Sequence, residues 1–177
     1  MNKQTLTGFI QKYSLGNNVE SVEWNCNKKI LSSAFVAEDK TLMGEVLLKD
    51  FDFEDCKIGI YTTSQLTRML SVLGDDITLS LNKIVDKYTS IKIKDSNTNV
   101  DYILADPDVI PKVPTLKELP DFSTTIKIDN NFINQFIKSK NALSDVDYFT
   151  IVNKGNPQLI IGYSSINSNR ISYDITT

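Results

Sequence analysis

One pattern occurs three times in the sequence, about sixty residues apart: a helix followed by three strand-like stretches. The helices are identified by apolar residues at i, i+3, i+4 and i+7, the spacing of one buried helix face. These positions are Leu6, Phe9, Ile10 and Tyr13 in the first repeat and Leu66, Met69, Leu70 and Leu73 in the second. The third helix carries Phe132, Ile133, Phe136 and Ile137. The next equivalent position in the third helix is Lys140, so the match is less complete there. Such a repeat predicts a fold built from copies of one supersecondary unit, in which neighbouring copies bury each other's apolar faces.

The strand-like stretches after the helices predict an antiparallel meander in each repeat. They are residues 21–25, 29–37 and 41–48 in the first repeat, 76–81, 88–94 and 100–105 in the second, and 147–153, 158–163 and 170–175 in the third. Several alternate as half-buried strands do, for example Ile91-Lys92-Ile93-Lys94. A further strand is expected before the second helix (57–61) and before the third (124–128), whereas the first helix has almost none. We therefore predict an α+β fold of repeated β-α-β-β-β units.

The ends of two helices are predicted by residues that favour caps. Thr63 or Ser64 is expected to cap the start of the second helix, and Gly74 to end it. Asp129 or Asn130 is expected to open the third helix.

A proline-rich segment separates the second and third repeats. Residues 106–122 contain four of the five prolines in the chain. Proline lacks an N–H and fixes φ, so this segment should be extended and should not join a sheet. We therefore predict a first domain at 1–105 with two repeats, a connector at 106–122, and a partial second domain at 123–177 with one repeat.

The three helices and their flanks contain no acidic residue, although the chain carries a formal charge of −3. The acid-free windows are residues 1–19, 56–74 and 130–144, and their basic residues are Lys3, Lys12, Lys57, Arg68, Lys138 and Lys140. Helix first turns normally attract Asp and Glu, because the N-terminal end of the helix dipole is positive. The absence of acids from all three helices indicates a surface that meets a polyanion.

The composition argues against several other classes of protein. With 41% apolar and 23% charged residues the chain reads as soluble and globular, without a membrane span or an export signal. The chain has no histidine, which removes the commonest general base and the usual zinc ligand. Cys26 and Cys56 match no metal-ligand spacing, and we expect reduced, partly buried thiols, with a disulfide as the alternative. No metal, cofactor or catalytic residue is expected.

Several short stretches carry a resemblance to a known family. Ile58-Gly59-Ile60-Tyr61 leads into the second helix, and Asp75-Asp76 opens the strand after it. Ala105-Asp106-Pro107 begins the proline-rich segment, and Gln135-Phe136-Ile137-Lys138 lies in the third helix. Together with the order of the repeats, these stretches resemble the DNA polymerase sliding clamps, most closely those of T4-like bacteriophages, over essentially the whole chain.

The resemblance implies the sliding-clamp fold, with helices on one face of antiparallel sheets. Such proteins are closed rings in which the helices line the hole and the sheets form the outer wall. Duplex DNA is held by topology and by weak, sequence-independent phosphate contacts. The implied function is that of a processivity factor, not an enzyme, which binds double-stranded DNA, the replicative polymerase and the clamp loader. The implied location is the host cytoplasm during phage infection.

Five basic residues of the acid-free helices are candidates to face the DNA. At 100° per residue, Arg68 and Lys138 lie nearly opposite the apolar stripes of their helices. Lys12 lies to the side and Lys3 flanks the stripe, so both would reach phosphates by extending. Lys140 lies on the apolar side if the helix continues. For each residue the alternative is a solvated side chain without a specific role.

The proline-rich segment resembles the interdomain connector, which in this family covers a hydrophobic pocket for short partner peptides. The apolar candidates for partner binding are Val109, Ile110, Val113 and Leu116. Buried apolar anchors carry most of the energy of such interfaces. The alternative is that these residues simply hold the linker on the sheet.

The family also implies an edge-to-edge contact between subunits. The expected interface joins the last strand of the first domain to a strand near residue 170 of the neighbour, and its residues are Val100, Asp101, Tyr102, Ile103, Leu104, Arg170, Ile171, Ser172 and Tyr173. Rings of two-domain subunits are trimers, so a homotrimer is expected if the ring closes.

The number of repeats departs from the family, and other functions remain open. Phage members have two domains of two repeats each, whereas this sequence has three repeats, so we expect a shortened or a divergent member. The main rival function is a phage structural or assembly subunit that uses the same repeat. An enzyme acting through carboxylates comes third.

Overall fold

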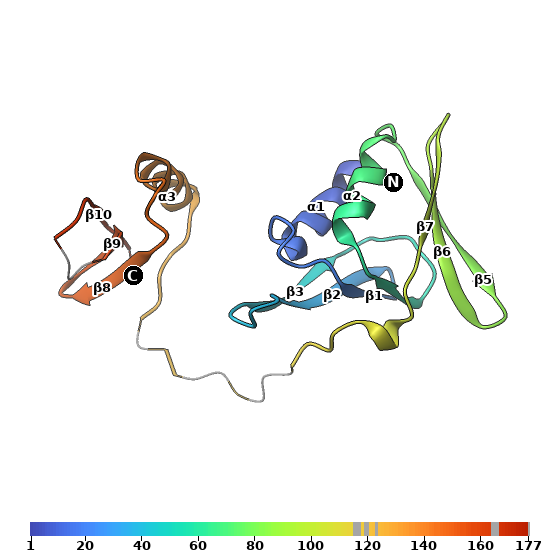
Figure 1. Cartoon of the computed structure of the whole chain (residues 1–177), viewed down its shortest axis with the longest axis horizontal. Coiled ribbons are helices and arrows are strands. Elements are labelled where there is room, and N and C mark those ends of the chain that lie inside the picture. The colour runs from blue at the N-terminus through green and yellow to red at the C-terminus, as the bar shows by residue number, and fades with distance from the viewer. Residues whose placement is uncertain (115–117, 119–120, 123, 164–166, 177) are drawn as a thin grey trace. The chain divides into compact units, whose positions relative to one another are not determined.

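A computed structural model describes residues 1–114, 118, 121–122, 124–163 and 167–176 (Figure 1). The chain divides into two compact units, Met1–Thr115 and Leu116–Thr177, here called the N-terminal and C-terminal units. Within the described residues, no helix is long and apolar enough to cross a membrane.

The N-terminal unit contains the first two repeats. The first comprises α1 (Lys3–Ser14), β1 (Val22–Asn27), β2 (Ile30–Val36) and β3 (Met43–Leu48). The second comprises β4 (Cys56–Ile60), α2 (Thr63–Ser71), β5 (Thr78–Ile84), β6 (Lys87–Lys94) and β7 (Asn99–Ile103), followed by a short 3₁₀ helix, η1 (Pro107–Val109). The sheets have the orders β3-β2-β1-β4 and β5-β6-β7, and every pairing is antiparallel.

The two repeats of the N-terminal unit exchange their first strands. β4 precedes α2 but pairs with β1 of the first repeat. Conversely, Asn2 precedes α1 and forms a bridge with Asp76, beside β5. The amide of Lys3 donates to the carbonyl of Asp75 at 2.7 Å, and the amide of Ile77 donates to the carbonyl of Met1 at 2.9 Å. Each repeat therefore completes the sheet of the other.

The helices α1 and α2 pack side by side and antiparallel over the sheets (Figure 1). The Lys3 ammonium, in the first turn of α1, donates to the carbonyl of Leu73, just beyond α2. The Tyr13 hydroxyl, near the end of α1, lies 3.3 Å from the hydroxyl of Thr63, the first residue of α2. In each contact, the first residue of one helix meets the eleventh residue counted from the start of the other helix. The two repeats are thus related by an approximate two-fold axis.

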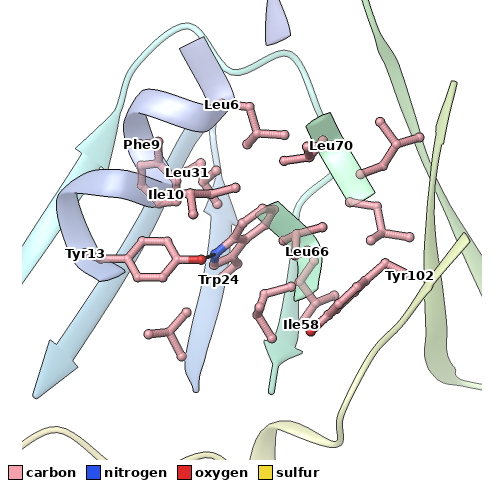
Figure 2. Close-up of a cluster of buried hydrophobic side chains, with 14 of the residues drawn as sticks. Leu6, Phe9, Ile10, Tyr13, Trp24, Leu31, Ile58, Leu66, Leu70 and Tyr102 are labelled. Atoms are coloured by element: carbon pink, nitrogen blue, oxygen red, sulfur yellow. Dashed lines mark hydrogen bonds between the residues drawn. The ribbon is translucent and has the colours of Figure 1, made fainter. Parts of the chain in front are cut away.

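The core of the N-terminal unit lies between the helix pair and the sheets (Figure 2). Leu6, Ile10, Leu66 and Leu70 are fully buried, which confirms the helix faces predicted from the spacing. Trp24 of β1 lies under both helices, with its ring 5.8 Å from that of Phe9 in an edge-to-face arrangement.

The C-terminal unit contains one repeat, formed by α3 (Asn130–Ala142), β8 (Phe149–Lys154), β9 (Asn156–Ile161) and β10 (Ile171–Asp174). The sheet has the order β10-β9-β8. Its core consists of Leu159, Ile161 and Ile175, against which Phe132 and Phe136 of α3 pack. The prediction that Ile133 and Ile137 share this buried face is wrong, because both are exposed.

The strand predicted at 124–128 is not formed. Among the described residues, this segment is joined to the end of its own sheet by a backbone hydrogen bond from the amide of Lys127 to the carbonyl of Thr176 at 3.1 Å. Its counterpart β4 is likewise joined to the second residue after the last strand of its own repeat, by a bridge between Gly59 and Ala105. β4 becomes a strand because β1 of another repeat lies beside it, and the described part of the C-terminal unit offers no such neighbour.

The helix ends agree only in part with the predicted caps. Asp129 caps α3 as predicted, and its side chain accepts from the Phe132 amide at 2.9 Å. The start of α2 is capped instead by Glu20, whose carboxylate accepts from the Ser64 amide at 2.9 Å. Gly74 does not end α2, since the helix stops at Ser71 and the Gly74 amide donates to Asp95 at 2.6 Å.

Cys26 and Cys56 lie directly opposite each other in the β1–β4 pair. Both are buried free thiols. The hydrogen bond with Cys56 and burial raise the pKa of the Cys26 thiol.

Candidate nucleic-acid interface and partner groove

The outward side of α1 and α2 carries isolated positive charges among neutral residues. Lys12 and Arg68 are exposed, and their neighbours on this side include Gln4, Gln11 and Gln65. Neither helix contains a carboxylate, in its first turn or elsewhere. Amides and cations without carboxylates suit contact with phosphate oxygens.

The outward side of α3 has the same chemistry. Lys138 is exposed, and Asn131, Asn134, Gln135 and Asn141 are exposed with it. α3 also contains no carboxylate. The structure thus gives all three helices an uncharged or positive outer side.

The other two candidate lysines are held by backbone carbonyls. Lys3 is half-buried and donates to the carbonyl of Leu73. Lys140 is half-buried and donates to the carbonyl of Ser144 at 2.9 Å. Both ammonium groups lie where a helix C-terminus is partially negative, which gives them a structural role.

The ion pairs of the described residues lie away from the helices. They are Lys29–Asp52, Lys57–Glu23, Lys83–Asp86 and Lys87–Asp106, all in strands or in the segments between them. Within the described part of the chain, no salt bridge involves Lys12, Arg68 or Lys138. These three charges are therefore not compensated by a neighbouring carboxylate.

The start of the connector is fixed to the N-terminal unit. The Ala105 amide donates to the carbonyl of Gly59 at 2.9 Å, and Asp106 pairs with Lys87 at 2.7 Å. The ion pair with Lys87 and the bond from the Asp108 amide lower the pKa of the Asp106 carboxyl.

The four apolar candidates of the connector differ in exposure. Ile110 is buried against the N-terminal unit, as simple linker packing predicts. Val109 is exposed and Val113 is half-buried, so these two remain accessible to a partner. Leu116 lies outside the described residues.

A groove that the sequence did not predict opens beside the connector. Its volume is about 1090 Å³, and the apolar residues among those that line it are Leu15, Val19, Val36, Ala37, Leu42 and Pro111. Most of the lining comes from the loop after α1 and the turn between β2 and β3, which are far apart in sequence. Pro111 was the only signal of the groove in the sequence, because it lies in the proline-rich segment.

The strands expected at the subunit interface are both at sheet edges. β7 is the outer strand of β5-β6-β7, and β10 is the outer strand of β10-β9-β8. Val100 and Tyr102 point into the core, whereas Asp101 and Ile103 point outward, with Ile103 73% exposed. Leu104, Ile171 and Tyr173 are half-buried, and Arg170 and Ser172 are exposed.

Known protein structures share this arrangement. No protein-family model and no curated protein sequence matches the chain. A. fulgidus PCNA, solved with the C-terminal region of FEN-1, superposes with a TM-score of 0.69 over 99% of this chain and 70% of its own, at 18% identity. Entamoeba histolytica PCNA gives 0.64 over 98% and 71%, at 13% identity. The chain has the sliding-clamp fold.

The same clamp fold is found in a bacterial protein with a longer chain. The DNA polymerase III subunit beta of Pseudomonas aeruginosa gives a TM-score of 0.54 over 98% of this chain and 52% of its own, at 14% identity. The fold predicted from the repeats is thus confirmed. Because every identity is low, the likeness establishes the clamp fold, and the function rests on the residues described above.

Proposed function

We propose that this protein is a non-enzymatic sliding clamp, a ring-forming processivity factor for the replicative DNA polymerase of a T4-like bacteriophage in the host cytoplasm. The observation that carries the proposal is the absence of carboxylates from all three helices of a sliding-clamp fold. Exposed Lys12, Arg68 and Lys138 supply the contacts to duplex DNA. The chain needs no cofactor for this role.

Sparse positive charge suits a protein that slides. Each lysine or arginine near a phosphate releases counterions and adds a weak, sequence-independent attraction. A dense basic patch would hold the protein in place, whereas a few charges among neutral amides let it move. Retention then depends on encircling the duplex.

The groove beside the connector is the proposed docking site for partners. Val109, Val113 and the groove residues Val36, Leu42 and Pro111 supply apolar surface for a short peptide of the polymerase or the clamp loader. The A. fulgidus PCNA structure, which holds the C-terminal region of FEN-1, supports peptide docking on this fold.

The subunit contact proposed for the ring is edge pairing between β7 of one copy and β10 of the next. Ile103 supports this contact, because it is a large apolar side chain exposed on an edge strand. The resemblance to two-domain clamps implies a homotrimer.

Charge reversal tests the DNA-facing helices. Arg68→Glu and Lys138→Glu should weaken binding to duplex DNA, and each should lower the slope of log affinity against log salt by about one, because each removes one phosphate partner. The matched control is Lys49→Glu, because Lys49 is an exposed lysine outside the helices. A phage structural or assembly subunit built on the same repeat would respond to none of the three substitutions. Equal weakening by Lys49→Glu would show that only net charge matters.

A further inference from the structure

The two cysteines of the chain face each other where the first two repeats share a sheet. Cys26 is the fifth residue of β1, in the first repeat, and Cys56 is the first residue of β4, in the second. They form the last matched pair of the β1–β4 register, which begins with Val22 opposite Ile60. The two thiols therefore lie at the end of the pairing that joins one repeat to the other.

The register brings the two side chains close enough for a covalent bond. Residues directly opposite in an antiparallel pair have Cα atoms about 4.5–5.5 Å apart, and a disulfide spans Cα separations of about 4.4–6.8 Å. Both side chains belong to the core of the N-terminal unit, and the Cys26 thiol donates a hydrogen bond to the Cys56 sulfur. A disulfide between them requires little movement of the backbone.

The end of the strand pair shields both thiols. Cys26 is 4% exposed and Cys56 is 8% exposed. Exposed residues 27–30 follow Cys26, and exposed Glu54 and Asp55 precede Cys56. The ends of paired strands open locally at a much lower free energy than global unfolding requires. Opening of this terminal pair gives a small reagent access to both sulfurs.

We propose that Cys26 and Cys56 are a reversible redox site, which a small-molecule disulfide such as oxidised glutathione converts to a disulfide between the first two repeats. This role goes beyond the proposed clamp function and does not depend on it.

The reaction is two successive thiol–disulfide exchanges. The Cys56 thiolate attacks one sulfur of oxidised glutathione, breaks its S–S bond and releases one glutathione thiolate. The Cys26 thiolate then attacks the Cys56 sulfur of this mixed disulfide, forms the Cys26–Cys56 bond and releases the second glutathione thiolate. The two protein thiols lose two protons and two electrons, which the two glutathione thiolates receive. Cys56 reacts first, because it is the more exposed and the hydrogen bond from the Cys26 thiol lowers its pKa.

The disulfide strengthens the exchange of first strands between the repeats. The loop that it closes contains β2 and β3. Closing a loop of this kind removes conformations from the unfolded chain and so stabilises the folded one. Gly59 of β4 also forms a bridge with Ala105, at the start of the connector. Oxidation therefore holds β4 on β1 and, through β4, holds the start of the connector.

Oxidation of the intact, folded protein tests the site. After incubation with oxidised glutathione and then iodoacetamide, peptide mass spectrometry should find Cys26 linked to Cys56 within one chain and neither thiol alkylated. Dithiothreitol should restore both thiols. The oxidised protein should unfold at a higher urea concentration than the reduced protein, because the closed loop constrains the unfolded chain.

Single-cysteine variants provide the matched controls. Cys26→Ser should keep glutathione on Cys56, because no second thiol can displace it, and Cys56→Ser should take up glutathione on Cys26 more slowly. Neither variant should show the rise in urea midpoint. The proposal would be overturned if both wild-type cysteines stayed alkylatable after oxidised glutathione, if they paired only in urea or only between two chains, or if oxidised and reduced protein had equal urea midpoints.

Discussion

At the scale of single residues, a chain of buried hydrogen bonds joins the first two repeats. The Trp24 indole N–H donates to the Tyr13 hydroxyl at 3.3 Å, and the Thr63 hydroxyl donates to the Glu20 carbonyl at 2.9 Å. Because Thr63 gives its only proton to Glu20, Tyr13 must donate to Thr63. Burial raises the pKa of Tyr13 to about 12, so this donor stays protonated.

Removal of the Tyr13 hydroxyl tests this chain. Tyr13→Phe leaves the buried indole N–H of Trp24 without a partner, and should lower the free energy of unfolding by about 1–3 kcal/mol. Urea unfolding followed by the fluorescence of Trp24, the one tryptophan, measures it. Tyr61→Phe is the control, because Tyr61 is exposed. Equal midpoints for Tyr13→Phe and the wild type would mean that the hydrogen bonds contribute nothing.

At the scale of elements, the connector is held where it passes β4. A Cβ atom placed on Gly59 would lie 2.6 Å from the carbonyl oxygen of Ala105 and 3.2 Å from Cγ1 of Ile110. The strand and the start of the connector therefore touch at a position where only glycine fits. This contact keeps the connector beside the partner groove.

Gly59→Ala should loosen the connector. The added methyl group must displace Ala105, which we expect to cost about 1–3 kcal/mol and to speed hydrogen exchange at the Ala105 amide. Gly8→Ala is the control, since nothing lies within 4 Å of that position in α1. It should instead stabilise the helix by about 0.5–1 kcal/mol. Unchanged exchange at Ala105 in Gly59→Ala would show that the connector is not held there.

The elements were predictable where local spacing decides them. We could predict the helices, the three meanders and the absence of acidic residues from the helices, because each depends on residues close in sequence. Contacts with distant segments were not predictable. The Lys3 ammonium donates to the carbonyl of Leu73, and this contact forms only when α1 and α2 pack together. Glu20 caps α2 from another repeat, and the groove joins two remote loops to Pro111. The apolar spacing that predicted a buried Ile133 assumes that another element packs on that side of the helix. Among the described residues no element covers this side chain, so Ile133 is exposed.

At the scale of the whole molecule, the proposed ring is held by pairing of β7 of one copy with β10 of the next. The resemblance to two-domain clamps implies three copies in that ring. Sedimentation of the protein counts the copies, and a mass of three chains is the expected result.

The central claim is that the protein holds DNA by encircling it. The most direct measurement is its retention on circular duplex DNA, loaded with its clamp loader, before and after the circle is cut once. We expect the protein to stay on the closed circle through gel filtration and to dissociate from the linear product, unless the DNA ends are blocked. Equal retention on circular and linear DNA would contradict the account.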